Sequence, residues 1–300
     1  MNFRIGVDGG GTKTECVLLD AHGAVAACQT APGCNPSVVG PERARAVLRE
    51  ALQALVAGPL PVTVDRLLLC MSGSQSFWRE MGVGLGGYGR VETMPDSLPV
   101  LELATGGEPG LVVHAGTGSF VAARAPDGSV HYAGGLGWRF GDPGSGYDLG
   151  RRAIALALLE LQGWAPRTAL AEQLSAHTGI AGYAANSRWF YRGGDADPTI
   201  AAFAPRVVEL AGQGCAPARR VIAESLTGLA ALVDAVQSRL FPGATMDSPV
   251  PCGVSGELLN RPPCWSALHD LAATPARPVE LRPVTGRPIE GVCRLLQKMA

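Results

Sequence analysis

The sequence predicts an α/β protein built from two related halves. Strand-like and helix-like segments alternate over the first third of the 300-residue chain. A pattern of apolar strand, glycine turn and second strand opens the chain at residues 3–20 and returns at residues 110–124. Amphipathic segments that follow the second copy are expected to cover its sheet. With 47% hydrophobic residues the chain can bury two cores, and we place the boundary near Gly106.

The first half is predicted to hold a three-stranded meander, a helix, two more strands and a second helix. Strands are expected at residues 3–10, 14–20, 24–30, 66–73 and 90–94. Residues 41–57 begin with proline, keep apolar residues on one face and are followed by Gly58-Pro59, which predicts an amphipathic helix. A glycine-rich passage at 82–89 is expected as a loop, and residues 98–106 are expected as a helix.

The second half repeats the strand pattern and then becomes helical. Residues 110–134 predict strand, glycine turn, strand, Pro-Asp-Gly hairpin and strand. Helices are expected at 146–163 and 215–240, and a short strand near 248–254 is expected to run through a glycine turn into another helix. A late strand at 278–284 and a terminal helix at 287–299 complete the prediction.

Composition excludes several classes of function. The formal net charge is -1, and lysine and arginine are scattered, so no basic surface for nucleic acid or an anionic membrane is expected. The first residues lack the features of a signal peptide, and no uninterrupted apolar window of about eighteen residues occurs, so we expect a cytoplasmic protein. Eight cysteines without a C-x-x-C pair offer no zinc or iron–sulfur spacing and are expected mostly as buried thiols.

Two glycine turns are candidates for binding phosphate. The residues Gly9, Gly10, Gly11 and Thr12, and later Gly116, Thr117, Gly118 and Ser119, combine small side chains, available N–H groups and hydroxyls between strands. Neither is a Walker A loop, because Lys13 follows the threonine and a strand follows the turn. One such turn alone is better explained as a plain hairpin, but two at corresponding places favour phosphate binding.

Carboxylates follow two strands. Asp8 ends the first strand and could hold a hydrated Mg²⁺ against nucleotide phosphates, or it could cap the turn. Asp96 follows a strand and precedes a helix, so it could be a helix N-cap or a general base for a sugar hydroxyl. Residues 134–150 carry seven glycines with Trp138, Asp142 and Ser145 among them, and this costs more chain entropy than a plain connection would justify. A ligand-binding loop is expected there.

These motifs resemble one family. In order, DGGGTKT, PDSLPVLELA, HAGTGSF, GGLGWRFGDPGSGYDLG and PCGVSGELL resemble the phosphate-1, connecting, phosphate-2, sugar-loop and adenosine elements of the BadF/BadG/BcrA/BcrD ATPases, and most of all of their N-acetylglucosamine kinases. The resemblance covers nearly the whole chain. It implies two ribonuclease H-like (actin-like ATPase) domains, each a mixed five-stranded sheet flanked by helices, with a cleft between them. The domains would be residues 1–107 with 286–300, and residues 108–285.

The resemblance also implies roles for individual residues. Asp96 would be the catalytic base toward the sugar 6-hydroxyl, and Asp8 would hold Mg²⁺ through water. Sugar contacts would come from Asn35, Asp96, Ser119, Phe120, Gly135, Leu136, Gly137 and Asp142. ATP would be bound by Gly10, Gly11, Thr12, Lys13, Gly116, Thr117, Gly118, Gly214 and Gly253. The expected reaction is phosphorylation of N-acetylglucosamine or a close amino sugar by Mg-ATP in a homodimeric enzyme.

The chain departs from the family pattern at three places, and two other functions remain open. Pro143 stands where a glutamate is usual, Gly214-Cys215 where Gly-Asp is common, and CGVSG where a Gly-Gly pair is frequent. One alternative is an ATPase that activates a partner dehydratase or reductase, although no cysteine lies in the glycine loops. The other is a catalytically inactive sugar sensor, although both Asp8 and Asp96 are present.

Overall fold

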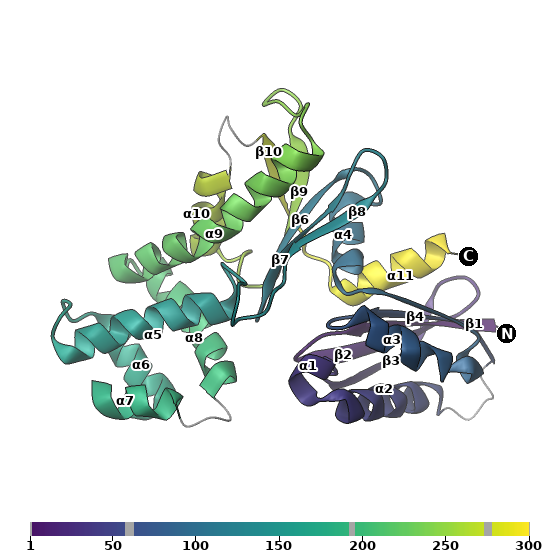
Figure 1. Cartoon of the computed structure of the whole chain (residues 1–300), viewed down its shortest axis with the longest axis horizontal. Helices are drawn as coiled ribbons and strands as arrows, with labels where there is room; N and C mark the ends of the chain where they lie inside the picture. Colours follow the sequence, from purple (N-terminus) through teal and green to yellow (C-terminus); the bar gives the residue numbers. More distant parts are fainter. Residues whose placement is uncertain (1, 58–62, 192–195, 273–277, 300) are drawn as a thin grey trace. The chain divides into compact units, whose positions relative to one another are not determined.

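The computed structural model describes residues 2–57, 63–191, 196–272 and 278–299. Contacts within the chain divide it into two compact units. Unit 1 comprises Met1–Gly107 and Thr285–Ala300, and unit 2 comprises Glu108–Val284. Figure 1 labels the helices and strands of both.

Unit 1 contains a mixed five-stranded sheet in the order β3-β2-β1-β4-β5. Its strands are β1 (Asn2–Gly9), β2 (Lys13–Leu19), β3 (Val25–Pro32), β4 (Thr63–Met71) and β5 (Arg90–Pro95). The first three form the predicted antiparallel meander, whereas β4 runs parallel to both β1 and β5. The carboxyl ends of β1, β4 and β5 therefore meet at one edge of the sheet, together with the β1–β2 turn.

Helices cover both faces of this sheet because its side chains alternate between two apolar layers. Ile5 and Val7 pack with α2 (Pro41–Val56) and with Trp78 of α3 (Gln75–Val83). On the other face, Gly6 lies against α11 (Pro288–Lys298), which packs closely on α4 (Ser97–Thr105). The short helices α1 (Pro36–Val39) and η1 (Gly86–Tyr88) complete the unit. The predicted end of α2 at Gly58-Pro59 lies outside the described residues.

The sequence prediction omitted α3, which spans Gln75–Val83. Part of this helix falls in the passage that we expected to be a loop. The reason for the error is that glycines flank a short segment and hide its periodicity. Trp78, fully buried and hydrogen-bonded through Nε1 to the carbonyl of Ser72 at 2.8 Å, anchors α3 to the end of β4.

Unit 2 repeats the topology of unit 1. Its sheet has the order β10-β9-β6-β7-β8, with strands β6 (Gly110–Ala115), β7 (Ser119–Arg124), β8 (Val130–Gly134), β9 (Val250–Ser255) and β10 (Val279–Pro283). As in unit 1, the first three strands form an antiparallel meander and the last two add in parallel. The predicted fold class, two mixed five-stranded sheets flanked by helices, is thereby confirmed.

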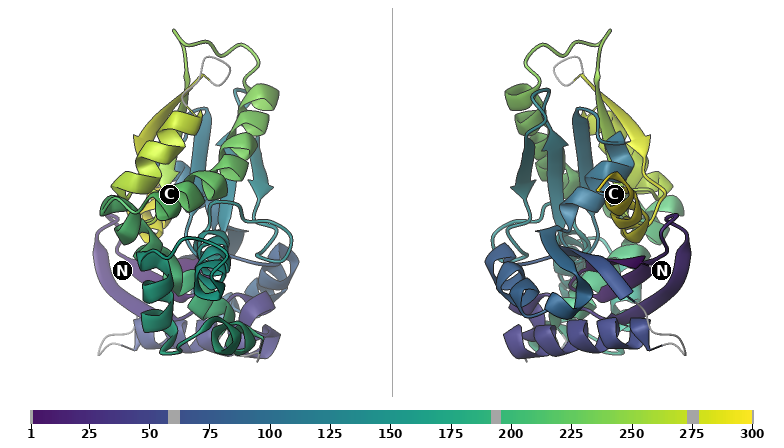
Figure 2. Two further views of the ribbon diagram at one scale, coloured as in Figure 1. Left: turned by 90° about the vertical axis from the view of Figure 1, so that its left-hand side faces the viewer. Right: turned by 90° about the vertical axis from the view of Figure 1, so that its right-hand side faces the viewer.

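One core cluster fills unit 2 between its sheet and its helices. The helices are α5 (Gly146–Gln162), α6 (Ala169–Thr178), α7 (Tyr183–Phe190), α8 (Ala196–Gly212), α9 (Ala216–Leu240) and α10 (Pro262–Ala272). Figure 2 shows α9 running along the sheet, and Val221, Leu226 and Leu229 of this helix are buried in the core cluster. By length and hydropathy α9 would also suit a membrane span, but its packing is that of a core helix.

Two further expectations need comment. The helix expected directly after the β9 turn begins only at Pro262, because residues 257–260 form turns. Among the cysteines, all recorded as free, five are buried, and Cys28 is exposed. The expectation of mostly buried thiols is therefore confirmed.

Candidate functional site

In unit 1, the β1–β2 turn exposes backbone that could meet phosphate. The amide of Gly10 closes the turn on the carbonyl of Lys13 at 2.9 Å, while Gly11 and Thr12 lie exposed at its tip. Within the described chain, no backbone hydrogen bond is recorded for the N–H of Gly11 or Thr12. Gly33 supports the turn from below, where a Cβ would lie 2.0 Å from the carbonyl oxygen of Gly11. The turn is therefore a hairpin with N–H groups available to an anion.

Asp8 lies at the end of β1 with 9% of its surface exposed. The pKa of its carboxyl is raised to about 7, chiefly by burial and also by the negative charges of Asp96 and Glu15, with Lys13 acting in the opposite direction. Glu15 is the cross-strand partner of Asp8. This carboxylate is a poorly compensated buried acid beside the turn, and a nearby cation would stabilise its charged form.

Glu15 was not among the predicted site residues, although the register of the hairpin places it beside Asp8. Its carboxylate accepts from Lys13 Nζ at 2.6 Å and from Arg287 Nη1 at 3.1 Å. Lys13, predicted to bind ATP, therefore contacts Glu15 in this structure. Arg287 is the residue that precedes α11, so the network joins residues 285–300 to the turn.

Asp96 occupies the N-cap position of α4 but makes no side-chain capping hydrogen bond. Burial raises the pKa of its carboxyl to about 6, and the adjacent N–H groups of Asp96 and Ser97 lower it only in part. An N-cap role, the simplest alternative from the sequence, therefore does not explain this residue. Its charge and that of Asp8 both raise the pKa of the buried Cys70 thiol, so the two carboxyls lie in one region of unit 1.

The predicted sugar contact Asn35 caps α1. Its Oδ1 accepts from the N–H of Ser37 at 3.0 Å and lies against Gly73, which follows β4. The side-chain oxygen of Asn35 is therefore occupied by the helix N-terminus, and its side-chain nitrogen Nδ2 is the group that could bind a ligand.

In unit 2, three glycine turns meet at the carboxyl end of β6. The turn at Gly116–Gly118 is closed by a 2.8 Å hydrogen bond from Gly116 N to the carbonyl of Gly118. Gly146, the first residue of α5, donates to the carbonyl of Gly116 at 2.8 Å. Gly256 follows β9 with φ +100°, and a Cβ there would lie 2.0 Å from the carbonyl oxygen of Ala115. Only glycine allows this close approach, so the turn after β9 depends on it.

Asp142 organises the loop between β8 and α5. It is buried with a positive φ of 61°, and its Oδ1 accepts from the N–H of Gly137 at 3.3 Å. Burial raises the pKa of this carboxyl, while the N–H groups of Gly137, Leu136 and Ser119 lower it. The carboxylate also lies against Gly118 of the glycine turn. Asp142 therefore ties the expected sugar loop to the expected phosphate loop within one unit.

Ser119 and Phe120, predicted to contact sugar, lie buried in β7. Ser119 Oγ donates to the carbonyl of Pro143 at 2.7 Å, and Phe120 stacks on His114 and on Tyr132 with centroid distances of 4.9 and 5.2 Å. Tyr132 in turn packs against Gly135. In this structure these side chains support the loop from below.

The rest of the loop is open to solvent. Leu136 is 65% exposed and Phe140 83%, and the exposed Trp138 lies tilted against Tyr147 of α5 with ring centroids 5.0 Å apart. A positive φ at both Gly135 and Gly137 lets the backbone double back around Leu136. An exposed loop with apolar side chains and a fixed acid at its base is suited to holding a small ligand.

The chain matches the model of the BadF/BadG/BcrA/BcrD ATPase family over residues 5–270, which is most of its length. The chain belongs to this family.

Relatives of this BadF/BadG/BcrA/BcrD ATPase family member include two curated kinases. The N-acetyl-D-glucosamine kinase of Dictyostelium discoideum is 30% identical over 57% of this chain and 58% of its own length. The chain thus matches less than two thirds of that protein. The N-acetylmuramic acid/N-acetylglucosamine kinase of Clostridium acetobutylicum is 26% identical over 79% of each chain.

Solved structures show the same fold. A candidate N-acetylglucosamine kinase from Chromobacterium violaceum is 26% identical, with a TM-score of 0.76 over 98% of this chain and 99% of its own. A glucokinase of the ROK family from Streptomyces griseus, solved with glucose and AMPPNP, is 14% identical with a TM-score of 0.60 over 99% of this chain and 100% of its own. At that identity the second likeness concerns the fold alone.

The two remaining glycines predicted to bind nucleotide in this family member lie in different elements of unit 2. Gly253 lies within β9, paired with Val112 of β6 and Arg282 of β10, so the turn residue at this strand end is Gly256. Gly214 has a φ of +95° and forms the turn between α8 and α9.

The sequence analysis also missed a partly buried polar pair in unit 2. His114 ends up opposite Ser255 across β6 and β9, with Nδ1 and Oγ 3.2 Å apart. Burial lowers the pKa of His114 to about 4, so the ring is neutral at physiological pH. A histidine within a buried apolar strand directly before a glycine turn was the available signal.

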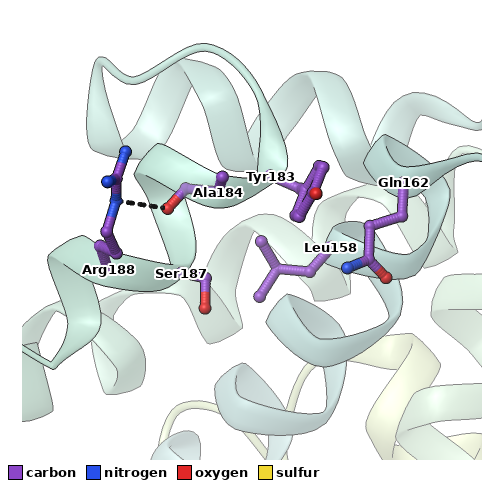
Figure 3. A pocket seen from close by; sticks show the side chains of 6 residues that line it. All are labelled: Leu158, Gln162, Tyr183, Ala184, Ser187 and Arg188. Carbon is purple, nitrogen blue, oxygen red and sulfur yellow. Dashed lines mark hydrogen bonds between the residues drawn. The ribbon is translucent and has the colours of Figure 1, made fainter.

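An open pocket of about 380 Å³ lies between α5 and α7, and none of the predicted site residues lines it. Figure 3 shows its lining residues, among which Arg188 donates to the carbonyl of Ala184 at 3.2 Å. No carboxylate lines the pocket. It therefore offers no general base and does not compete with the Asp8–Asp96 region as a candidate active site.

Proposed function

We propose that this chain phosphorylates the 6-hydroxyl of N-acetylglucosamine or a close amino sugar with Mg-ATP. Family membership and the curated kinase relatives support a sugar kinase. The observation that carries the finer proposal is Asp96, a partly buried carboxyl that occupies a cap position without capping and has a pKa of about 6. A general base works best when its pKa lies near the working pH.

In the proposed reaction, Asp96 accepts the proton of the sugar hydroxyl. The hydroxyl oxygen forms a bond to the γ-phosphorus of ATP as the bond from that phosphorus to the β-bridging oxygen breaks, which releases ADP. Phosphoryl transfer needs positioning and charge neutralisation more than covalent participation by the protein. Two glycine turns and one base are sufficient protein groups for such a reaction.

The residues around Asp8 fit a magnesium ion held through water. Among the described residues no group of three or more histidine, cysteine, aspartate or glutamate side chains could hold a metal, which disfavours an all-protein cage. Mg²⁺ commonly takes one or two carboxylates and completes its shell with water and substrate phosphates. When bound, the ion neutralises phosphate charge. In this proposal Asp8 orients its waters, and the N–H groups and hydroxyls at Thr12 and Thr117 bind phosphate oxygens.

The loop of residues 134–145 is the proposed sugar site of unit 2. Asp142 is fixed there by loop N–H groups, and the exposed loop backbone at Gly135 and Gly137 remains available to sugar hydroxyls. In unit 1, the amide nitrogen of Asn35 is a separate proposed sugar contact. Because ATP is a substrate, we expect the enzyme to act in the cytoplasm.

A substrate panel tests the proposal. N-acetylglucosamine, N-acetylmuramic acid, glucosamine, N-acetylmannosamine and glucose are each supplied with ATP and Mg²⁺, ADP is followed in a coupled assay, and the product is assigned by ³¹P NMR. We expect sugar-dependent ADP release and a 6-phosphate with an N-acetylated amino sugar. ADP release without any sugar would instead favour the ATPase activator, and sugar binding without turnover would favour the sensor.

A further inference from the structure

One side chain at the carboxyl edge of the unit 1 sheet has no role in the account above. Ser72 follows Met71, which pairs with Gly9 of β1 on one side and with Pro95 of β5 on the other. The next residues on those strands are Gly10, in the phosphate-1 turn, and Asp96. Ser72 therefore stands between the proposed phosphate-binding turn and the proposed base.

The backbone of Ser72 is held on both sides. Its N–H donates to the carbonyl of Gly9 at 2.8 Å, and its own carbonyl accepts from Nε1 of the buried Trp78 at 2.8 Å. The next residue, Gly73, packs against Asn35, the predicted sugar contact. The position of the Ser72 Cβ is thus fixed by the sheet, by α3 and by α1.

The hydroxyl of Ser72 is buried and has no hydrogen-bond partner in the part of the chain that the structure describes. Leaving a buried hydroxyl unpaired costs free energy, so such groups in folded proteins normally meet a partner, an ordered water or a ligand. The nearby serines differ in this respect, because the hydroxyls of Ser74 and Ser76 hydrogen-bond to each other at 2.8 Å.

We propose that Ser72 is a substrate-positioning residue whose hydroxyl hydrogen-bonds to the acceptor hydroxyl of the sugar. This inference rests on the proposed kinase function. The acceptor oxygen must lie within reach of both the base and the phosphorus that it attacks, and Ser72 directly follows β4 between the strand ends that lead into Gly10 and Asp96. A hydroxyl group can donate to the acceptor oxygen while the sugar proton points to Asp96.

The Ser72→Ala variant separates this role from a structural one. Because the hydroxyl has no protein partner, its removal should leave the melting temperature of the ligand-free protein unchanged or slightly raised. The value of kcat/KM for the sugar should fall about 10-fold, while KM for ATP stays within about 2-fold. Ser76→Ala, an exposed serine on α3, is the matched control and should change none of these quantities.

Binding of a deoxy sugar provides a readout that does not depend on turnover. Wild type should bind N-acetylglucosamine about 10-fold more tightly than its 6-deoxy analogue in calorimetry, and Ser72→Ala should show a smaller ratio, because only Asp96 then meets the 6-hydroxyl. Equal discrimination by both proteins would overturn the assignment, as would a variant that melts several degrees lower without ligand, since the hydroxyl would then serve the fold or a bound water. If wild type neither binds nor phosphorylates any sugar, the proposed function itself is wrong. If wild type is active and Ser72→Ala has the same kcat/KM and sugar affinity, only the role of Ser72 is wrong.

Discussion

Replacing Asp8 by asparagine should stabilise the ligand-free protein at neutral and alkaline pH. In the folded state the carboxyl has a pKa of about 7, against 3.8 ordinarily, chiefly because it is buried. Between these two values the folded state keeps a proton that the unfolded state has released, so stability is full below pH 3.8 and declines as the pH rises to about 7. The free energy of unfolding lost over that interval is roughly 4 kcal/mol, at about 1.4 kcal/mol for each unit of pKa difference.

Asparagine has the same shape and no charge to bury, so Asp8→Asn should escape this loss. Thermal unfolding with a chelator present should show the variant melting on the order of 10 °C above wild type at pH 8 and close to it at pH 4. Mg²⁺ with ATP should then raise the melting temperature of wild type more than that of the variant. Asp65→Asn, at an exposed position of β4, is the control and should show no such pH dependence. A variant no more stable than wild type at pH 8 would refute the argument that Asp8 is an uncompensated buried charge.

Three further predictions concern the two units. Turnover should rise with pH through about 6 as Asp96 loses its proton, and Asp96→Asn should lower kcat by about 10² or more with sugar binding retained, both measured in the coupled assay. Asp142→Ala should raise KM for the sugar about 10-fold and KM for ATP much less, because the loop loses its internal acceptor; the reverse pattern would count against a sugar loop. Gly256→Ala should destabilise unit 2 by about 2 kcal/mol or more in urea unfolding, since the new Cβ would lie 2.0 Å from the Ala115 carbonyl oxygen; a neutral result would show that the turn can rearrange.

The fold could be predicted from the sequence because its signals are local and occur twice. Alternating apolar residues, glycine turns and amphipathic helices gave every strand of both sheets, and the repeated meander gave the two-part organisation. The prediction failed where local signals were weak. Helix α3 is short and bordered by glycines, and its stability comes from the burial of Trp78, which depends on tertiary packing.

The site residues remain predictions to be tested, but the structure explains which of them sequence patterns could identify. Asp8 and Asp96 lie at the carboxyl ends of two strands that the sequence predicts. Because these strands run parallel, both residues come to the same edge of the sheet. The partners of His114 and Glu15, and the unpaired hydroxyl of Ser72, depend on register and packing between distant segments. Gly253 was expected to bind nucleotide from the family motif, whereas it lies within β9 and the turn after this strand is at Gly256. The expected homodimer likewise remains a prediction, which light scattering of the purified protein would test.

The return of residues 285–300 to unit 1 has a consequence for how the chain is made. Ile289, Val292 and Leu296 of α11 form one face of the unit 1 core, and Lys298 bonds to the buried Glu102 at 2.6 Å. During synthesis unit 2 is complete once residue 284 has emerged, whereas unit 1 still lacks a helix that its sheet needs. Until α11 is synthesised, one apolar face of the unit 1 sheet stays uncovered. We therefore expect unit 2 to acquire protease resistance before unit 1 in nascent chains.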